Sequence, residues 1–325
     1  MTFTTMMAAA PVGQARVLCL GAGMLGGRIS RVLTQTGHEV HIVSRTGQSR
    51  RQNHHRADLA TITGRATVID LVNRMKPDRL ILVHGPSDVS WFEEHEEEAR
   101  NTHVEICRLL ADTPCLLVST DNVFNGDCGL RRDDERPDPS NAYGRVKFAA
   151  EQALCNSRGH REHMVLRVSL VYHEDGSGRA DFVQTCLRRA HEGKPFKVPC
   201  DQFLTPVHVD DVAVVCAALI QAGSARYSGE KNRLRNLSTW HLAGPEELSR
   251  EQIARRVYRS VGANPSLVVG VPRDQTRWAC RPTYSSLQSS DFSHLPGLAA
   301  WRPRDIDAGL EQMKIQRLAM SKEAQ

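Results

Sequence analysis

The pattern G-x-G-x-x-G over residues 21–26 is the first candidate site in this sequence. It follows an apolar run at 16–20, which predicts a strand, and it opens a stretch with helical periodicity. Glycines at this spacing let the backbone turn tightly and approach a pyrophosphate, whose charge is held by the amides and dipole of a helix N-terminus. A purely structural glycine turn is the alternative. The candidate cofactor residues here are Gly21, Gly23, Met24, Leu25 and Gly26.

The second predicted strand, 39–43, is followed by Ser44 and Arg45. An NAD site commonly places an acidic residue there for the ribose 2′-hydroxyl, and none is present. Arg45 with Ser44 would instead suit the 2′-phosphate of NADP, so NADP (NADPH) is favoured, while NAD and a plain surface arginine stay open. Asp58 and Leu59, placed where the third strand should end, could bracket the adenine.

Tyr143 and Lys147 form a second candidate site, because side chains at i and i+4 lie one turn apart on one helix face. The pair starts a predicted helix and comes 23 positions after Thr120, which ends an apolar strand. A free tyrosine titrates near ~10, and a cation one turn away is expected to lower the Tyr143 pKa toward that of a usable proton donor. Alone, Y-x-x-x-K is usually an exposed pair. The three residues together form a candidate site.

Alternating apolar strands and periodic helices position these residues. Apolar runs without polar alternation are typical of a parallel sheet covered by helices on both faces. The first half of the chain therefore predicts an α/β fold with a doubly wound parallel (Rossmann) sheet. Strands are expected at 16–20, 39–43, 79–83 and 115–118, and helices around 25–33, at 68–75, and from the glutamate run 93–98 onward.

After about residue 172 the alternation weakens, and frequent prolines punctuate short elements from 245 onward. Helices are expected at 182–190 and 211–222 and a strand at 206–209. This pattern predicts a smaller, irregular α/β C-terminal substrate domain. We place the dinucleotide-binding domain at 15–172 and 203–242, and the substrate domain at 173–202 and 243–325.

The composition narrows the class of protein. The chain has 325 residues, and its net charge of +5 comes from 42 basic and 37 acidic side chains scattered along it, a weak argument for nucleic acid. No run of about 18 apolar residues predicts a membrane span. The nine cysteines form no Cys-x-x-Cys motif, and their odd number argues against a framework of disulfides. Both observations favour a reducing, cytoplasmic location. The histidines form no H-E-x-x-H pattern, so we expect no metal.

Longer blocks of the sequence resemble the extended short-chain dehydrogenase/reductase superfamily and, within it, the dTDP-4-dehydrorhamnose reductase group. The glycine turn belongs to this resemblance, which spans most of the chain. Two blocks carry it most specifically: Ser119-Thr120-Asp121-Asn122-Val123-Phe124-Asn125-Gly126 and Asp138-Pro139-Ser140-Asn141-Ala142-Tyr143-Gly144-Arg145-Val146-Lys147. Looser matches are Pro77-Asp78, Asn101, Leu166-Arg167-Val168-Ser169, Asp201-Gln202, Thr205-Pro206 and the run from Arg281 to Leu287.

This resemblance implies hydride transfer between a nicotinamide cofactor and a ketone, with Thr120, Tyr143 and Lys147 as the catalytic set. Tyr143 would donate the proton, Thr120 would hydrogen-bond the carbonyl oxygen, and Lys147 would also hold the nicotinamide ribose. His84 and Gly85 would lie beside the cofactor. Asp121 and Asn122 would contact substrate with Thr120 and Arg281. Arg273, Arg277 and Arg281 could grip a nucleotide diphosphate or be solvated.

Two positions depart from the pattern of those reductases. Leu170 stands where they tend to carry an aromatic residue, and His84-Gly85-Pro86-Ser87 replaces an alanine-rich segment. We predict an NADP(H)-dependent reductase of a 4-keto (deoxy)sugar nucleotide. The alternatives are a sugar-nucleotide epimerase or dehydratase, a reductase of a non-sugar substrate, and a catalytically silent NADP-binding regulatory subunit. A homodimer stays open, since this superfamily often dimerises through helices.

Overall fold

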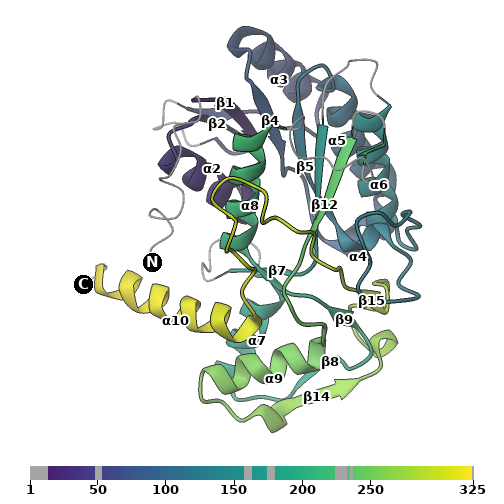
Figure 1. The fold of residues 1–325 in the computed structure, drawn as a ribbon. Coiled ribbons are helices and arrows are strands. Elements are labelled where there is room, and N and C mark those ends of the chain that lie inside the picture. Colours follow the sequence, from purple (N-terminus) through teal and green to yellow (C-terminus); the bar gives the residue numbers. More distant parts are fainter. Residues whose placement is uncertain are drawn as a thin grey trace.

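The computed structural model describes residues 14–47, 53–156, 163–173, 180–223, 233–234 and 237–323. Its centre is an eight-stranded sheet in the order β11-β12-β6-β5-β4-β1-β2-β3 (Figure 1). β11 pairs antiparallel with β12, and the other described strand pairs of this sheet are parallel. The strands are β1 (Arg16–Leu20), β2 (Glu39–Ser44), β3 (His54–Arg56), β4 (Arg79–Leu82), β5 (Cys115–Thr120), β6 (His163–Val168), β11 (Arg233–Leu234) and β12 (Leu237–Leu242).

Helices cover both faces of this sheet. Side chains alternate along each strand, so Val17 and Cys19 pack into one apolar cluster with α2 and α8, while Leu18 and Leu20 pack into another with α3, α5 and α6. The strand order reverses at β1, which places a crevice at the carboxyl ends of β1 and β4. The predicted doubly wound sheet is confirmed. The helices are α2 (Met24–Gln35), α3 (Ile62–Met75), α5 (Glu96–Leu109), α6 (Ala142–Cys155) and α8 (Val209–Ala222).

Two regions differ most from the predicted helix bounds. α3 begins at Ile62 rather than near Val68, because the Thr61 hydroxyl accepts a hydrogen bond from Gly64 N at 3.0 Å and caps the helix. The stretch around the glutamate run holds two helices, α4 (Val89–Glu94) and α5, separated at His95. His95 leaves helical geometry with φ −132° and ψ 37°, and its ring stacks on Trp91 with centroids 4.7 Å apart.

A third apolar cluster forms the smaller region at one end of the sheet, in the lower part of Figure 1. It joins segments far apart in the sequence, among them Phe182, Leu248 and Met313. The predicted division into two domains is a proposal that this cluster supports. Its helices are α7 (Phe182–Glu192), α9 (Arg250–Ser260) and α10 (Ile306–Glu323); the short strands are β7 (Val171–Tyr172), β8 (Phe196–Pro199), β9 (Phe203–Leu204), β10 (Val207–His208), β13 (Leu248–Ser249), β14 (Val268–Val271) and β15 (Tyr284–Ser285).

Within the described residues, every helix is too short or too polar to cross a bilayer.

Candidate active site

The glycine turn between β1 and α2 has three glycines in three different settings. Gly21 has φ +119°, and a Cβ there would lie 2.7 Å from the Val83 carbonyl oxygen. A Cβ on Gly26 would lie 1.8 Å from Gly21 O, so only glycine lets the helix pack on the turn. Gly23 is the N-cap of α2 and supplies no side-chain cap. A Cβ there would meet nothing within 4 Å. The first amides of α2, with Met24 and Leu25, therefore face an open space that suits an anion.

The two segments predicted to hold the adenosine end lie side by side. Ala57 N, just after β3, donates to Ser44 O at 3.0 Å, and this bond brings the turn at Asp58 next to the end of β2. Arg45 is exposed beside it. The Asp58 carboxylate accepts from Ala60 N at 3.1 Å, and Leu59 packs into the core. Their roles toward a cofactor stay predictions.

His84 and Gly85 follow β4 at the carboxyl edge of the sheet. The His84 ring stacks on His103 of α5 with centroids 5.3 Å apart, and its Nε2 bonds Thr102 O at 3.1 Å. Burial, assisted by the Lys147 charge, lowers the pKa of His84 to about 4, so the imidazole is neutral at pH 7. Gly85 has φ +86°, and a Cβ there would lie 2.5 Å from the His103 ring.

Thr120, Asp121 and Asn122 form a buried polar cluster at the end of β5. Thr120 Oγ1 donates to Asp121 Oδ1 at 2.9 Å and accepts from Asn122 N at 3.2 Å. Asn122 Nδ2 also donates to Asp121 Oδ1 at 2.6 Å. Burial raises the pKa of the Asp121 carboxyl, while its hydrogen bonds oppose that shift. The cluster therefore holds the Thr120 hydroxyl in a fixed place.

The start of α6 is fitted closely against this cluster. Asn141 caps the helix by accepting from Gly144 N at 2.8 Å, and its Nδ2 donates to Asn122 Oδ1 at 2.8 Å. A Cβ on Gly144 would lie 1.9 Å from Asn122 O. The first turn of α6, which carries Tyr143, therefore lies against the residues that follow Thr120.

Tyr143 and Lys147 both face the carboxyl end of β5. Tyr143 interacts with Thr120 electrostatically, and its ring packs edge-on against Phe92 with centroids 4.8 Å apart. Lys147 Nζ donates to Val118 O at 2.9 Å. The structure thus brings the three predicted catalytic residues together, although their chemical roles stay predictions.

The predicted lowering of the Tyr143 pKa is wrong for this structure. Burial is the largest cause of the shift, and with the Asp121 charge it raises the Tyr143 pKa to about 12, against the effects of the Thr120 hydroxyl and the Arg281 charge. The Lys147 ammonium is bonded to the strand, and burial lowers its own pKa. Desolvation of the phenolate therefore outweighs the cation one turn away.

The loop that carries Arg281 lies over the start of α6, since Asn141 Nδ2 also donates to Cys280 O at 3.3 Å. Arg281 acts electrostatically on Tyr143, whereas Arg273 is engaged within its own region: its backbone N donates to Asp201 Oδ1 at 2.7 Å and its guanidinium to Arg281 O. The exposed Arg277 lies over the Trp278 ring, 4.6 Å from the centroid. The side chains of the three arginines therefore lie in different environments.

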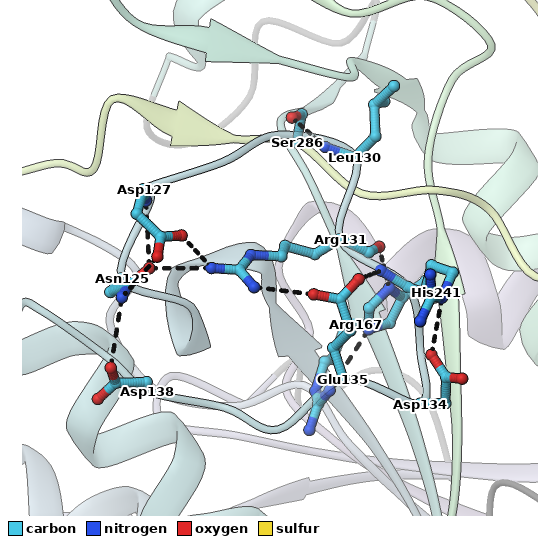
Figure 2. A network of polar contacts seen from close by, with 11 residues as sticks. Asn125, Asp127, Leu130, Arg131, Asp134, Glu135, Asp138, Arg167, His241 and Ser286 are labelled. Carbon is cyan, nitrogen blue, oxygen red and sulfur yellow. Dashed lines mark hydrogen bonds and ion pairs between the residues drawn. The ribbon is translucent and has the colours of Figure 1, made fainter.

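Arg131 fixes the loop between β5 and α6, as Figure 2 shows. Its guanidinium donates to Asn125 Oδ1 at 3.0 Å, to Glu135 Oε2 at 2.8 Å and to the Asp127 carboxylate. Its carbonyl oxygen pairs with His241 Nδ1 of β12 at 2.9 Å. This network ties the loop to the sheet and so sets the separation between the two blocks that carry the candidate site.

Sequence reasoning missed a buried pair beside this site, Arg250 and Gln202. Arg250 is 4% exposed and Gln202 0%, and Arg250 Nε donates to Gln202 Oε1 at 2.5 Å. Arg250 follows the N-cap Ser249 of α9, where an arginine is ordinarily solvated. Nothing local in the sequence signals its burial.

Comparison with known proteins places this geometry in context. The sequence model of a family described as RmlD substrate binding domain matches residues 15–314. A dTDP-4-dehydrorhamnose reductase of Mycolicibacterium smegmatis is 32% identical over 203 residues, which cover 61% of this chain but only 57% of that relative's own length. A dTDP-4-keto-6-deoxy-D-glucose reductase of Streptomyces niveus is 26% identical over 308 residues and 90% of each chain.

Other relatives carry different names. Methionine adenosyltransferase 2 subunit beta of Xenopus laevis is 27% identical over 249 residues, 74% of this chain and 70% of that protein. The fold matches dTDP-4-dehydrorhamnose reductase of Bacillus anthracis in complex with NADP, at TM-score 0.74 and 22% identity over 93% of this chain and 99% of that one. It also matches UDP-glucose 4-epimerase of Thermotoga maritima, at TM-score 0.75 and 17% identity over 94% and 99%.

Proposed function

Because this chain belongs to the RmlD substrate binding domain family, we propose that it is an NADPH-dependent reductase of the keto group of a 4-keto deoxysugar nucleotide. One observation carries the proposal. Tyr143 interacts electrostatically with Thr120, and Lys147 lies one turn further along the same helix with its ammonium on Val118 O. A ketone oxygen placed against Tyr143 and Thr120 would meet a proton donor and a fixed hydroxyl.

The glycine turn fits the cofactor that this reaction needs. The open α2 N-terminus at Gly23 suits a pyrophosphate, and Ser44 with Arg45 suits a 2′-phosphate. The NADP in the Bacillus anthracis structure supports this choice over NAD. When bound, NADPH supplies the hydride. His84 and Gly85 would line the nicotinamide side of the crevice.

Proton handling falls to the residues of the chain itself. Tyr143, with its pKa raised to about 12, keeps its proton at neutral pH and can pass it to the alkoxide oxygen as charge develops there. The Thr120 hydroxyl, bonded to Asp121, can turn its proton toward the same oxygen while Asn122 still donates to it. Lys147 holds a positive charge behind both residues, which favours the developing negative charge.

The test is NADPH oxidation by the purified protein with a dTDP-4-keto-6-deoxysugar. Tyr143→Phe should lower kcat roughly 10²- to 10⁴-fold, the usual effect of a general acid, and leave NADPH binding measurable. Tyr172→Phe is the matched control, because Tyr172 is a buried tyrosine of the smaller region that donates to Asp305 O. Unchanged NADPH oxidation by Tyr143→Phe would exclude the proposed chemistry.

Specific observations keep two alternatives in view. The likeness to methionine adenosyltransferase 2 subunit beta, together with the altered positions His84 and Leu170, favours a silent regulatory subunit. Turnover of any ketone would remove that candidate. The second alternative is an epimerase, and it would retain its cofactor through purification and consume no net NADPH. All nine cysteines are free thiols, which supports our proposal of a cytoplasmic location.

A further inference from the structure

Arg250 is a buried cation without a carboxylate ion pair among the residues that the structure describes. A guanidinium keeps its proton, so its charge must be compensated where it lies. Its carbon Cζ lies 4.6 Å from the Phe182 ring centroid and 5.2 Å from that of Trp278, and Nε donates to Gln202 Oε1. These neutral partners fix the orientation of the guanidinium but supply little opposing charge.

Gln202 adds a second donor to the same place. Because a guanidinium only donates, the Gln202 atom that faces Arg250 Nε is the oxygen, and the amide nitrogen points elsewhere. That nitrogen, Nε2, is buried and has no hydrogen-bond partner in the described parts of the chain. The side chains of Arg250 and Gln202 thus offer N–H donors to their surroundings. Their one acceptor, Gln202 Oε1, already accepts from Arg250 Nε. A buried donor without an acceptor destabilises the fold.

Charged groups of both signs act on the buried Arg250. Arg281 and Arg277 repel its guanidinium, while Asp121 attracts it. Asp121 already accepts hydrogen bonds from Thr120 and Asn122. The Asp121 carboxylate that attracts Arg250 is therefore already engaged by neighbouring donors.

We propose that Arg250 and Gln202 bind an anionic oxygen group of the substrate, a phosphate or a carboxylate. This deepens the proposed reductase function and rests on it for the rest of the substrate. The Nη atoms of a guanidinium that lies against two rings offer the paired donors that recognise two oxygens of such a group. The anionic group belongs to the part of the substrate that contacts the smaller region, with the ketone at Thr120 and Tyr143.

The test is calorimetric titration of the full-length protein, saturated with NADP⁺ so that the glycine turn is occupied, with inorganic pyrophosphate and, separately, with D-glucuronate. The variants are Arg250→Met and Gln202→Met. Arg256→Gln is the control, since Arg256 lies on the same helix but pairs with Glu246 at 2.6 Å and Asp307 at 3.1 Å. We expect at least one anion to bind wild type and Arg256→Gln alike, and to bind Arg250→Met about 10- to 100-fold more weakly, the usual effect of losing a charged hydrogen bond.

The two anions separate the two sources of the group. Loss of pyrophosphate binding in Arg250→Met assigns the subsite to a phosphate, and loss of glucuronate binding assigns it to a carboxylate. If neither anion binds wild type, or if each anion that binds wild type also binds Arg250→Met at wild-type affinity, the proposal is overturned. Should circular dichroism show Arg250→Met unfolded, the same criteria apply to Arg250→Lys and Gln202→Met.

These titrations need no turnover, so the outcome is independent of the reductase assay. Anion binding that depends on Arg250, with no oxidation of NADPH by any 4-keto sugar nucleotide, would overturn the reductase and keep the subsite. Where turnover is found, Arg250→Met should raise KM by about the same factor as it weakens anion binding and leave kcat within about threefold. This result is expected when a contact is lost that binds the ground state and the transition state equally.

Discussion

Substituting Gly144 with alanine tests whether the fit between α6 and the end of β5 is what brings Tyr143 to Thr120. Gly144 is buried in the first turn of α6, and a Cβ there would lie 1.9 Å from Asn122 O and 2.9 Å from Pro139 Cβ. The first of these neighbours is a backbone atom that cannot rotate away. The added methyl group must therefore push α6 from the segment that follows Thr120.

The displacement follows from the geometry. Real Cβ contacts essentially never fall below 3.0 Å, so the two elements must separate by at least 1.1 Å, the difference between 3.0 and 1.9 Å. A misplacement of about 1 Å at reacting groups typically costs on the order of 100-fold in rate. We therefore expect kcat to fall about 100-fold in Gly144→Ala, a loss of transition-state stabilisation of about 2.7 kcal/mol.

The assay is NADPH oxidation at saturating substrate, with the unfolding midpoint and NADPH affinity measured on the same samples. Gly27→Ala is the matched control, because it too is a helical glycine but a Cβ there would lie 3.7 Å from Ala22 O, an ordinary contact. We expect Gly27→Ala to be as stable as wild type or slightly more so. If folded Gly144→Ala keeps kcat within twofold of wild type, the close fit does not position Tyr143 and the reasoning fails.

Two further predictions address the glycine turn and a buried histidine. Gly23→Asp should weaken NADPH binding at least about 100-fold, because the added carboxylate repels the pyrophosphate. The unfolding midpoint should not change, because a Cβ at Gly23 meets nothing within 4 Å. Fluorescence titration with NADPH measures the affinity. Burial lowers the pKa of His241 to about 3, below the unfolded value near 6.5, so its stabilisation is present above pH 6.5 and is lost as pH falls toward 3. Between pH 7 and pH 5, wild type should lose about 2 kcal/mol more unfolding free energy than His241→Gln, measured by urea titration.

Local signals were sufficient for the parts of the fold that depend on neighbours in sequence. The run Arg16–Leu20 and the glycines after it specify a strand, a turn and a helix start, and the structure has all three. Thr120 at a strand end and Tyr143 in the first turn of a helix were predictable for the same reason. A parallel sheet then brings strand ends to one edge, so the candidate site follows from the order of elements.

Properties that depend on burial were beyond the sequence. The sign of the Tyr143 pKa shift reversed because desolvation depends on how Phe92 and Asp121 enclose the phenol, and spacing along a helix says nothing of that enclosure. The break at His95, whose ring stacks on Trp91, falls within a run that otherwise reads as one amphipathic helix. The burial of Arg250 likewise depends on Phe182 and Trp278, which come from distant segments.

Two buried arginines show how burial alone fails to separate structure from function. Arg167 and Arg250 are both 4% exposed. Arg167 donates to Glu151 Oε1 at 3.1 Å and Oε2 at 2.7 Å, so its charge is matched by a carboxylate that is itself buried. Arg250 has neutral partners within hydrogen-bonding or ring-stacking distance. The first arrangement is complete within the chain, and the second leaves a charge that a ligand could complete.

This difference predicts opposite effects of the same substitution. Arg167→Met would leave the Glu151 carboxylate buried without its partner, which costs about 3–5 kcal/mol of unfolding free energy. Arg250→Met would remove a charge that the fold compensates poorly, and we expect stability equal to or above that of wild type, because replacing such a buried charge by an apolar side chain is often neutral or stabilising. Urea unfolding of the two variants decides between them. An equal loss of stability in both would mean that the fold itself requires the Arg250 charge, and the physical argument for a substrate anion at that position would no longer hold.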